Sequence, residues 1–412
     1  MIDDTHALTL AQRALILAKI FQAIPLYFAH WQDSELARDG LDAAFADLVE
    51  AALPCESRKR FSLLVMAFLA RFNNAHTRLF DPYLETLPPV GMALRPVEGR
   101  WTAVRSGYPG LTPGDVILRI EDRSADDWYA ELRAYAFGSP QARTIQFDAL
   151  LGAFLPERYC LQIEGADGAP RTLTIDRAAL RAGTAIQARA AAEAAEGRWL
   201  TDDLAMIRVP SFMQPEAEQR ARACVEEFSG ASALIVDVRD NHGGSTPGGL
   251  ISHLMDRPYR WWAESSPLTV GLLAVQAQRG GDAIFRSAHL QWPASVSDPE
   301  PSGYKGKLFL LVDRGTLSAA EDFTMPFKDN GRAVIVGETT GGSTGQPFMH
   351  TFEQGILLAV GTKRATMPDG TPFDWRIVVS TNQPLYVRAA EVMVEQFDAV
   401  GIKTHVEAVD AA

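Results

Sequence analysis

The sequence predicts an α/β protein, and three observations lead to this prediction. Four short, nearly continuous apolar runs, at residues 204–207, 233–238, 308–312 and 333–336, are typical of strands buried on both faces of a sheet, with helices between them. Before them come a region with helical periodicity and a region of short alternating strands. At roughly 100–200 residues per domain, 412 residues accommodate two to three such units.

Residues 1–85 are expected to form a helical region. In its first segment, apolar residues recur at three- and four-residue spacing, which places on one helix face Leu8, Leu10, Ala14, Leu15, Leu17, Ile20 and Phe21. Two further helices are predicted over residues 36–53 and 61–72. The end of the third helix leaves His76 on a loop.

Residues 86–180 are expected to form a small β domain. The predicted strands are residues 91–94, 101–104, the apolar stretch before Glu121, 159–164 and 171–175. Asp167-Gly168 lies between the last two and indicates a type I′ hairpin. An Ala-rich helical connector over 179–197 is then expected to lead into the α/β region, residues 181–412.

Charge and cysteine content exclude several classes of protein. A net charge of −12 argues against general nucleic-acid binding, which needs a basic stripe, and against docking on an anionic membrane. The three cysteines, Cys55, Cys160 and Cys224, form no CxxC pair, so a zinc ribbon or a disulfide framework is not expected. The N-terminus lacks the positive charge of a secretory signal, and no segment has the roughly 20 apolar residues of a membrane span. We expect a cytoplasmic protein, or an exported one whose signal has been removed.

Ser318 is the first candidate for chemistry. It follows the predicted strand 308–312 after a tight turn, at the start of a predicted helix, where partial positive charge favours a developing anion. The same serine and Glu321 have the Ser-x-x-Glu spacing of a capping box, so a purely structural role stays open.

The second candidate is the glycine-rich loop Asp237-Val-Arg-Asp-Asn-His-Gly-Gly-Ser-Thr-Pro-Gly-Gly249, which follows a buried strand. Such a loop can direct backbone N–H groups at an oxyanion, or it can be a turn that needs positive φ. His242 within it is more typical of a solvated turn residue than of a base. The aromatic segment 257–262 could line a substrate groove or lie buried against the sheet.

A competing pattern, Gly341-Gly-Ser-Thr-Gly345, matches the Gly-x-Ser-x-Gly nucleophile elbow of α/β-hydrolases. Asp374 and His405 follow it in that family's order, which makes an esterase using Ser343 an alternative. The elbow requires a helix after the serine, whereas here the apolar run 356–360 predicts a strand.

The candidate segments together resemble the C-terminal processing (tail-specific) peptidase family. The resemblance is carried by Leu-Ala-Met-Ile-Arg-Val-Pro-Ser-Phe212, by the Asp-Val-Arg-Asp-Asn-x-Gly-Gly block and by Arg-Gly-Thr-Leu-Ser-Ala-Ala-Glu321. A Gly-Leu-x-x-Gly-Asp-x-Ile segment from Gly110 resembles a PDZ domain, a peptide-docking module. The family implies a crotonase-like catalytic domain, an accessory PDZ-like domain and an N-terminal helical region, with Ser318 as nucleophile.

The general base separates two branches of this family. One branch uses a lysine about 25 residues after the nucleophile, but position 343 is a serine here. The other branch, which resembles tricorn protease and the retinoid-binding-protein-like peptidases, uses a histidine in a His-Thr segment and a late carboxylate. Asn73-Asn-Ala-His-Thr-Arg-Leu79 and Pro372-Phe-Asp-Trp375 match those places, which implies His76 as base and Asp374 as acid. This chain departs from the branch at Ala75, where a serine is usual, and in having aspartate for glutamate; Ser343 or a water is the candidate to bridge the gap.

The sequence therefore predicts a serine-type endopeptidase or C-terminal processing peptidase that acts on peptides or unfolded protein tails. Ser318, His76 and Asp374 would react, and backbone N–H groups of Gly243 or Gly244 and of Ala319 would hold the oxyanion. No metal or cofactor is expected, and a homo-oligomer is an open expectation. The alternative is a binding protein of the same fold that has lost catalysis, as the departures at positions 75, 343 and 374 would allow.

Overall fold

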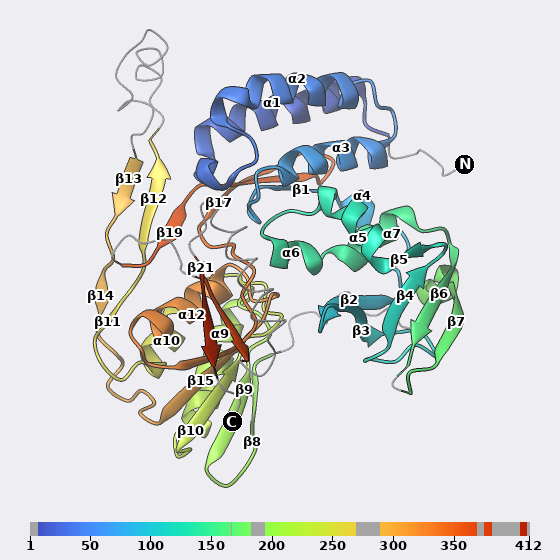
Figure 1. The fold of residues 1–412 in the computed structure, drawn as a ribbon. Helices are drawn as coiled ribbons and strands as arrows, with labels where there is room; N and C mark the ends of the chain where they lie inside the picture. The colour runs from blue at the N-terminus through green and yellow to red at the C-terminus, as the bar shows by residue number, and fades with distance from the viewer. Residues whose placement is uncertain are drawn as a thin grey trace.

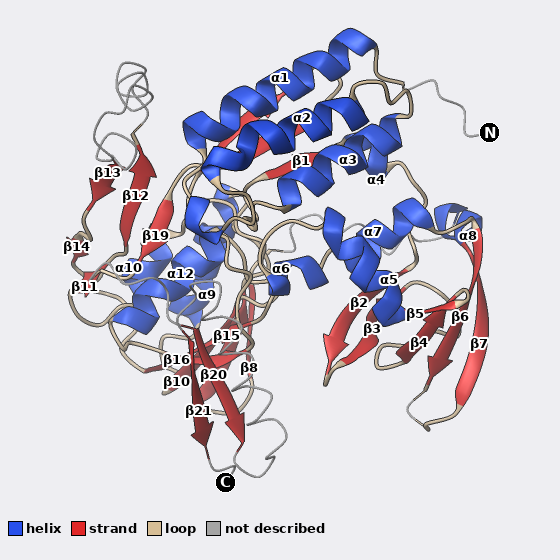
Figure 2. Ribbon diagram, turned by 45° about the horizontal axis from the view of Figure 1, so that its top comes forward, coloured by secondary structure: helices blue, strands red, loops and turns tan. Residues whose placement is uncertain are grey.

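The computed structural model describes residues 7–165, 167–182, 194–268, 289–368, 375–380 and 404–409. Figures 1 and 2 show its arrangement: N-terminal helices lie over one end of the molecule, a small β sheet stands to one side, and a larger α/β unit lies beneath the helices. None of the helices in these ranges is long and apolar enough to cross a membrane.

The N-terminal helices are α1 (Leu10–Tyr27), α2 (Leu41–Ala52), α3 (Arg58–Ala70) and the short α4 (Pro82–Glu85). The helices were expected, but the predicted buried face of α1 is partly wrong. Leu10, Leu15 and Phe21 are exposed, and the face that packs is instead made by Arg13, Ile16, Leu17, Ile20, Ala23 and Ile24. Periodicity alone selects the more apolar face, whereas the neighbours decide which face is covered: Arg13 is buried because its guanidinium donates to the Leu53 and Leu8 carbonyls.

These helices share their core with strands from the far end of the chain. Strand β1 (Arg78–Phe80) pairs antiparallel with β18 (Leu357–Gly361), which also pairs with β17 (Pro347–Thr351). Ile356, Leu358 and Val360 are buried against the helices' apolar side chains. The N-terminal region therefore does not pack alone, and the loop that carries His76 is held beside residues some 280 positions later.

The small sheet has the order β2-β3-β4-β6-β7, with the short β5 beside β4. Its elements are β2 (Met92–Val97), β3 (Arg100–Ser106), β4 (Val116–Ile120), β5 (Arg123–Ser124), α5 (Ala125–Leu132), α6 (Pro140–Thr144), α7 (Phe147–Phe154), β6 (Arg158–Glu164) and β7 (Pro170–Asp176). The predicted β6–β7 hairpin is present, with Glu164 opposite Pro170, so its connection is longer than the two-residue turn predicted.

The central sheet has the order β16-β15-β10-β9-β8. Its strands are β8 (Glu196–Trp199), β9 (Leu204–Arg208), β10 (Ala233–Asp237), β15 (Lys307–Val312) and β16 (Val334–Gly337), all parallel except β8. The four predicted strands are thus found in one sheet. The predicted helical connector begins in α8 (Arg177–Ala182), its last residues lie in β8, and residues 183–193 lie outside the described residues.

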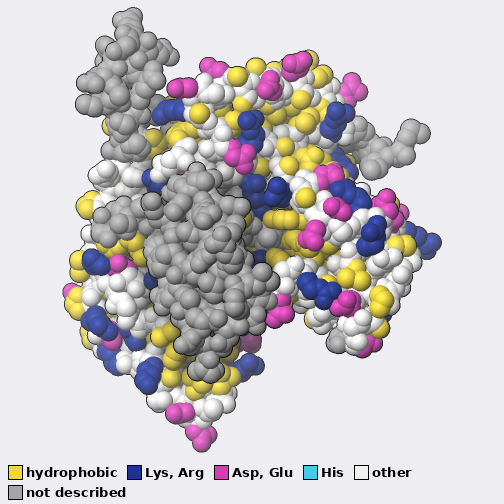
Figure 3. All heavy atoms as spheres, in the orientation of Figure 1, with side chains coloured by type: hydrophobic (Ala, Val, Ile, Leu, Met, Phe, Trp, Pro, Cys, Tyr) yellow, Lys and Arg dark blue, Asp and Glu magenta, His cyan; other side chains and the backbone are white. Residues whose placement is uncertain are grey.

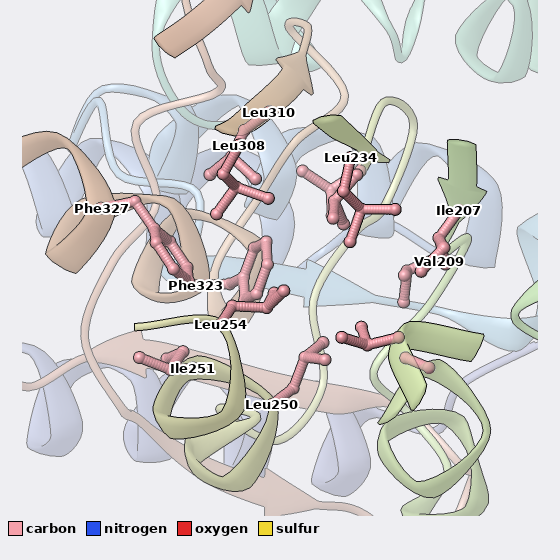
Figure 4. Packing of buried hydrophobic residues seen from close by; sticks show 14 of the residues in the cluster. Ile207, Val209, Leu234, Leu250, Ile251, Leu254, Leu308, Leu310, Phe323 and Phe327 are labelled. Atoms are coloured by element: carbon pink, nitrogen blue, oxygen red, sulfur yellow. The ribbon is translucent and has the colours of Figure 1, made fainter. Parts of the chain in front are cut away.

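Helices α9 (Pro215–Glu227), α10 (Gly248–Leu254) and α12 (Ala319–Asp329) contribute to the core of this sheet. Figure 4 shows Leu308 and Leu310 of β15 facing Phe323 and Phe327 of α12, with Leu254 close by. This packing fixes α12 against the strand that precedes it, and so fixes the position of its first residues.

The remaining strands form smaller sheets. They are β11 (Tyr259–Arg260) with β14 (Val296–Ser297), β12 (Ala263–Pro267) between β13 (His289–Trp292) and β19 (Arg364–Thr366), and β20 (Trp375–Ser380) with β21 (Thr404–Val409). Because β17 follows Gly345 directly, Ser343 has no helix after it, and the nucleophile-elbow reading is wrong. On the face drawn in Figure 3, acidic and basic side chains are interspersed over the N-terminal helices and the small sheet.

Truncating a buried core side chain should destabilise the protein. Replacing the fully buried Leu310 by alanine should lower the free energy of unfolding by about 2–5 kcal/mol, because it removes apolar contacts and leaves a cavity. Denaturant unfolding of the purified protein measures this loss. The matched control, Val334→Ala on the exposed edge strand β16, should change it by less than about 1 kcal/mol, and equal losses in both variants would contradict this account.

Candidate active site

Ser318 lies in a strained backbone conformation at the start of α12. It is the N-cap residue of that helix, with φ 53° and ψ −122°, a region that non-glycine residues rarely adopt. Such a conformation costs on the order of 1–3 kcal/mol and persists only where the surroundings hold it; strained residues of this kind cluster at functional sites. The turn before it is held by hydrogen bonds from the Gly315 N–H to Asp313 and from the Leu317 N–H to the Asn241 carbonyl.

His76 faces Ser318 from the N-terminal region. Its Nε2 lies 3.2 Å from the Ser318 Oγ, although the two residues are 242 positions apart. His76 is 8% exposed, and its pKa is lowered from 6.5 to about 4, mainly by burial and also by the nearby Arg78, while the Thr344 backbone opposes this shift. The ring is therefore neutral at pH 7, with one nitrogen able to accept a proton.

The other ring nitrogen of His76 has no partner in the described ranges. Nδ1 is buried and makes no hydrogen bond of normal length and angle there, although the Thr344 backbone lies near enough to the imidazole to raise its pKa. When Nε2 accepts a proton from Ser318, Nδ1 must carry the hydrogen, so the ring presents a buried N–H donor on that side. A buried donor without an acceptor costs about 1–3 kcal/mol, so this nitrogen calls for a carboxylate, a carbonyl or a water.

Glu321 is a site residue that sequence reasoning treated only as a helix cap. Its carboxylate is buried and accepts five hydrogen bonds, from the Ser318 N–H (3.2 Å), the Thr340 hydroxyl (2.6 Å), the Gly342 N–H (2.7 Å) and the N–H and hydroxyl of Ser343 (2.6 and 3.3 Å). Burial raises its pKa, and these hydrogen bonds oppose the rise. The Ser-x-x-Glu spacing was the available signal, but it does not reveal that the same carboxylate also binds the loop at 340–343.

Ser343 lies beside the nucleophile. Its hydroxyl oxygen accepts from the Ser318 N–H at 3.0 Å and donates to Glu321 at 3.3 Å, and the side chain is 2% exposed. The backbone N–H of the strained Ser318 therefore has two acceptors, the Glu321 carboxylate and the Ser343 hydroxyl. These contacts direct the Ser343 hydroxyl to the nucleophile's backbone instead of to the imidazole.

The glycine loop approaches Ser318 closely. A Cβ on Gly243 would lie 2.8 Å from the Ala319 nitrogen and from the Ser318 Cβ, so only glycine fits there. The Gly243 N–H is already used, because it donates to the Asn241 side chain at 2.9 Å. The N–H groups of Gly244 and Ala319 make no hydrogen bond within the described part of the chain, so these two donors remain available to an anion.

Other predicted residues are placed differently. Asp374 lies outside the described residues. His242 lies 3.4 Å from Asp240, and of the aromatic segment 257–262 Tyr259 is buried while Trp261 packs on the core of the central sheet. Within the described ranges, no group of three or more His, Cys, Asp or Glu side chains could hold a metal ion.

The contacts of Glu321 predict a stability effect. Glu321→Gln replaces an acceptor-only carboxylate by an amide whose NH2 would face donors, so we expect the free energy of unfolding at pH 7 to fall by about 1–3 kcal/mol. Chemical denaturation measures the change. Glu338→Gln, at a half-exposed carboxylate paired with Arg314, is the control and should cost less; a Glu321→Gln protein as stable as the parent would contradict the described network.

Comparison with known proteins finds similarity to one peptidase family. Residues 203–378 match the model of peptidase family S41. The chain is 25% identical over 300 residues to carboxyl-terminal-processing peptidase 2, chloroplastic, of Arabidopsis thaliana, covering 72% of this chain and 50% of that protein. It is 28% identical over 351 residues to the tail-specific protease of Haemophilus influenzae, covering 75% and 44%. The chain thus spans about half the length of these relatives.

Solved structures agree on the fold. The structure of mature CPAF superposes with a TM-score of 0.67 at 17% identity, over 88% of this chain and 90% of that one, and CPAF has also been solved in complex with lactacystin. This likeness establishes a mixed α/β fold of the S41 peptidase type. The resemblance to the C-terminal processing peptidases is confirmed: residues 203–378 of this chain match peptidase family S41, and its curated relatives are processing proteases.

Proposed function

We propose that this protein is a serine peptidase that hydrolyses peptide bonds in peptides or unstructured protein tails. The observation that carries the proposal is the 3.2 Å contact between the His76 Nε2 and the Oγ of a backbone-strained Ser318. A serine hydroxyl is a weak nucleophile by itself and needs an adjacent base. A neutral, buried imidazole at hydrogen-bond distance supplies that base.

The mechanism follows from these positions. His76 takes the Ser318 proton as Oγ attacks the scissile carbonyl, and it then protonates the leaving amine. The N–H groups of Gly244 and Ala319, which have no other partner in the described residues, donate to the oxyanion. Asp374 is proposed as the acceptor for the Nδ1–H of His76, a role that the unpaired Nδ1 supports.

The finer fold assignments are part of the same proposal. We assign residues 1–85 to an N-terminal helical region, 86–180 to a PDZ-like domain and 181–412 to a crotonase-like peptidase domain. The six-stranded small sheet and the mostly parallel central sheet support this division. A cytoplasmic location and a homo-oligomer stay predictions from the sequence.

Neither alternative function is favoured. The esterase reading requires a helix after Ser343, where the chain forms β17. The binding-protein reading rests on departures from the family pattern, but the serine and the histidine lie at hydrogen-bond distance despite Ala75.

The nucleophile is tested by substitution. Ser318→Ala should lower kcat/KM for an unstructured reporter peptide at least about 10³-fold, because it removes the attacking oxygen, and it should leave the unfolding midpoint within a few degrees. Ser232→Ala, at an exposed serine whose hydroxyl binds Asp203, is the control with full activity. A fluorophosphonate probe, or lactacystin, should label Ser318 in the parent. Peptidase activity that survives in the Ser318→Ala protein would refute the assignment.

The base is tested by the pH dependence. Imidazolium cannot accept a proton, so kcat/KM should fall as pH falls through the lowered pKa of His76, about 4, and stay level near pH 6.5 where a free imidazole would titrate. Stability follows the same sign, because a folded-state pKa below the unfolded value makes the unfolded chain bind more protons: this contribution is complete above pH 6.5 and is lost as pH falls from 6.5 to 4. A kcat/KM midpoint at 6.5, measured where the protein remains folded, would contradict the buried base.

A further inference from the structure

Asn74 organises the turn that presents His76. The Asn74 carbonyl accepts from the Thr77 N–H at 3.1 Å, which closes the turn. Its side-chain oxygen accepts from the His76 N–H at 3.0 Å and from the Thr77 hydroxyl at 3.1 Å. Asn74 is 4% exposed, and its one amide oxygen thus binds the two residues at the far side of the turn.

The same amide oxygen lies against the end of β18. A Cβ on Gly361 would lie 2.5 Å from the Asn74 Oδ1, so the strand approaches this side chain as closely as glycine allows. The Gly361 N–H donates to the Thr77 hydroxyl at 3.1 Å. The His76 turn is therefore attached to β18 at Thr77, one residue before β1 begins to pair with that strand at Arg78.

Beyond Gly361 the chain lies against the loop at 340–345, which supports the nucleophile. A Cβ on Gly345 would lie 2.3 Å from the Lys363 carbonyl oxygen, so the two segments are in close contact. Residues 340–343 of that loop bind Glu321, which in turn accepts from the Ser318 N–H. Asn74 thus holds the turn that carries His76, and Glu321 holds the backbone of Ser318. The contact between the chain after Gly361 and the loop at 340–345 links these two anchors.

We propose that Asn74 is a positioning residue for the general base: by binding the His76 N–H, its amide oxygen holds the imidazole so that Nε2 faces the Ser318 Oγ. This inference rests on the proposed function. Among the described residues, the imidazole makes a hydrogen bond of normal geometry to Ser318 and also lies near the Thr344 backbone, so the ring's direction depends mainly on its own backbone and its packing. Ala75 has only a methyl group, in contact with Gly138, and provides no polar anchor. A misplacement of about 1 Å in a catalytic group costs up to 10²-fold in rate.

Two variants test the proposal by the rate of fluorophosphonate labelling at Ser318 and by peptide hydrolysis. Asn74→Ala removes both acceptor contacts and should lower kcat at least tenfold with KM within twofold of the parent. Asn74→Asp keeps the acceptor oxygen but adds a carboxylate two residues from His76. The other charged or titratable groups near that imidazole are Arg78 and His30 among the described residues, together with the proposed Asp374. A nearby anion favours imidazolium, so the midpoint of the labelling-rate profile should rise by about one pH unit or more.

The control separates positioning from stability. Asn330→Ala removes an amide whose oxygen likewise accepts a backbone N–H, from Arg260, at the opposite end of α12, and it should leave kcat unchanged. A folded Asn74→Ala protein with kcat within twofold of the parent overturns the proposal. An Asn74→Asp midpoint equal to the parent's overturns it whether or not Asn74→Ala folds. Peptidase activity retained in Ser318→Ala and His76→Ala would instead refute the proposed function. The outcomes for the Asn74 variants leave that function unaffected.

Discussion

The pairing of β1 with β18 is the interaction on which the candidate site depends. Arg78 lies opposite Ala359, and this register places the turn before β1 against Gly361 and next to the loop at 340–345. Without it, the N-terminal helices would lose the buried side chains of β18, and His76 would have no fixed relation to Ser318. One short antiparallel pairing thus joins the N-terminal helical region and the segment around β18 in a single core and a single site.

Ser318 and Glu321 show how strain at the site is offset. The unfavourable φ of Ser318 is held by two acceptors for its N–H, the Glu321 carboxylate and the Ser343 hydroxyl. That carboxylate is itself costly to bury, and its five donors compensate for the lost hydration. The hydrogen bonds shared by Ser318 and Glu321 thus offset both the backbone strain of the serine and the burial of the carboxylate. This polar network is therefore rigid and sensitive to the loss of any member.

Much of the fold could be predicted from the sequence, because strands buried on both faces leave continuous apolar runs, as residues 308–312 do. The buried face of α1 could not, since Leu10 and Leu15 are as apolar as the residues that pack. At the site, the family motifs predicted Ser318 and His76, which the fold places together. Glu321 was assigned only as a cap, and the use of the Gly243 N–H by Asn241 was missed, because both depend on contacts that only the folded loop creates.

The separation of His76 and Ser318 along the chain has a consequence for biosynthesis. During translation the histidine turn leaves the ribosome long before the serine, and β18 follows later still. A nascent chain therefore contains neither the paired His76 and Ser318 nor the strand that aligns them until residue 361 has been made. Because residues 203–378 contain the nucleophile but lack His76, an S41 segment released by itself would also be without its proposed base. In this fold, the proposed base and nucleophile can come together only after β18 has been synthesised.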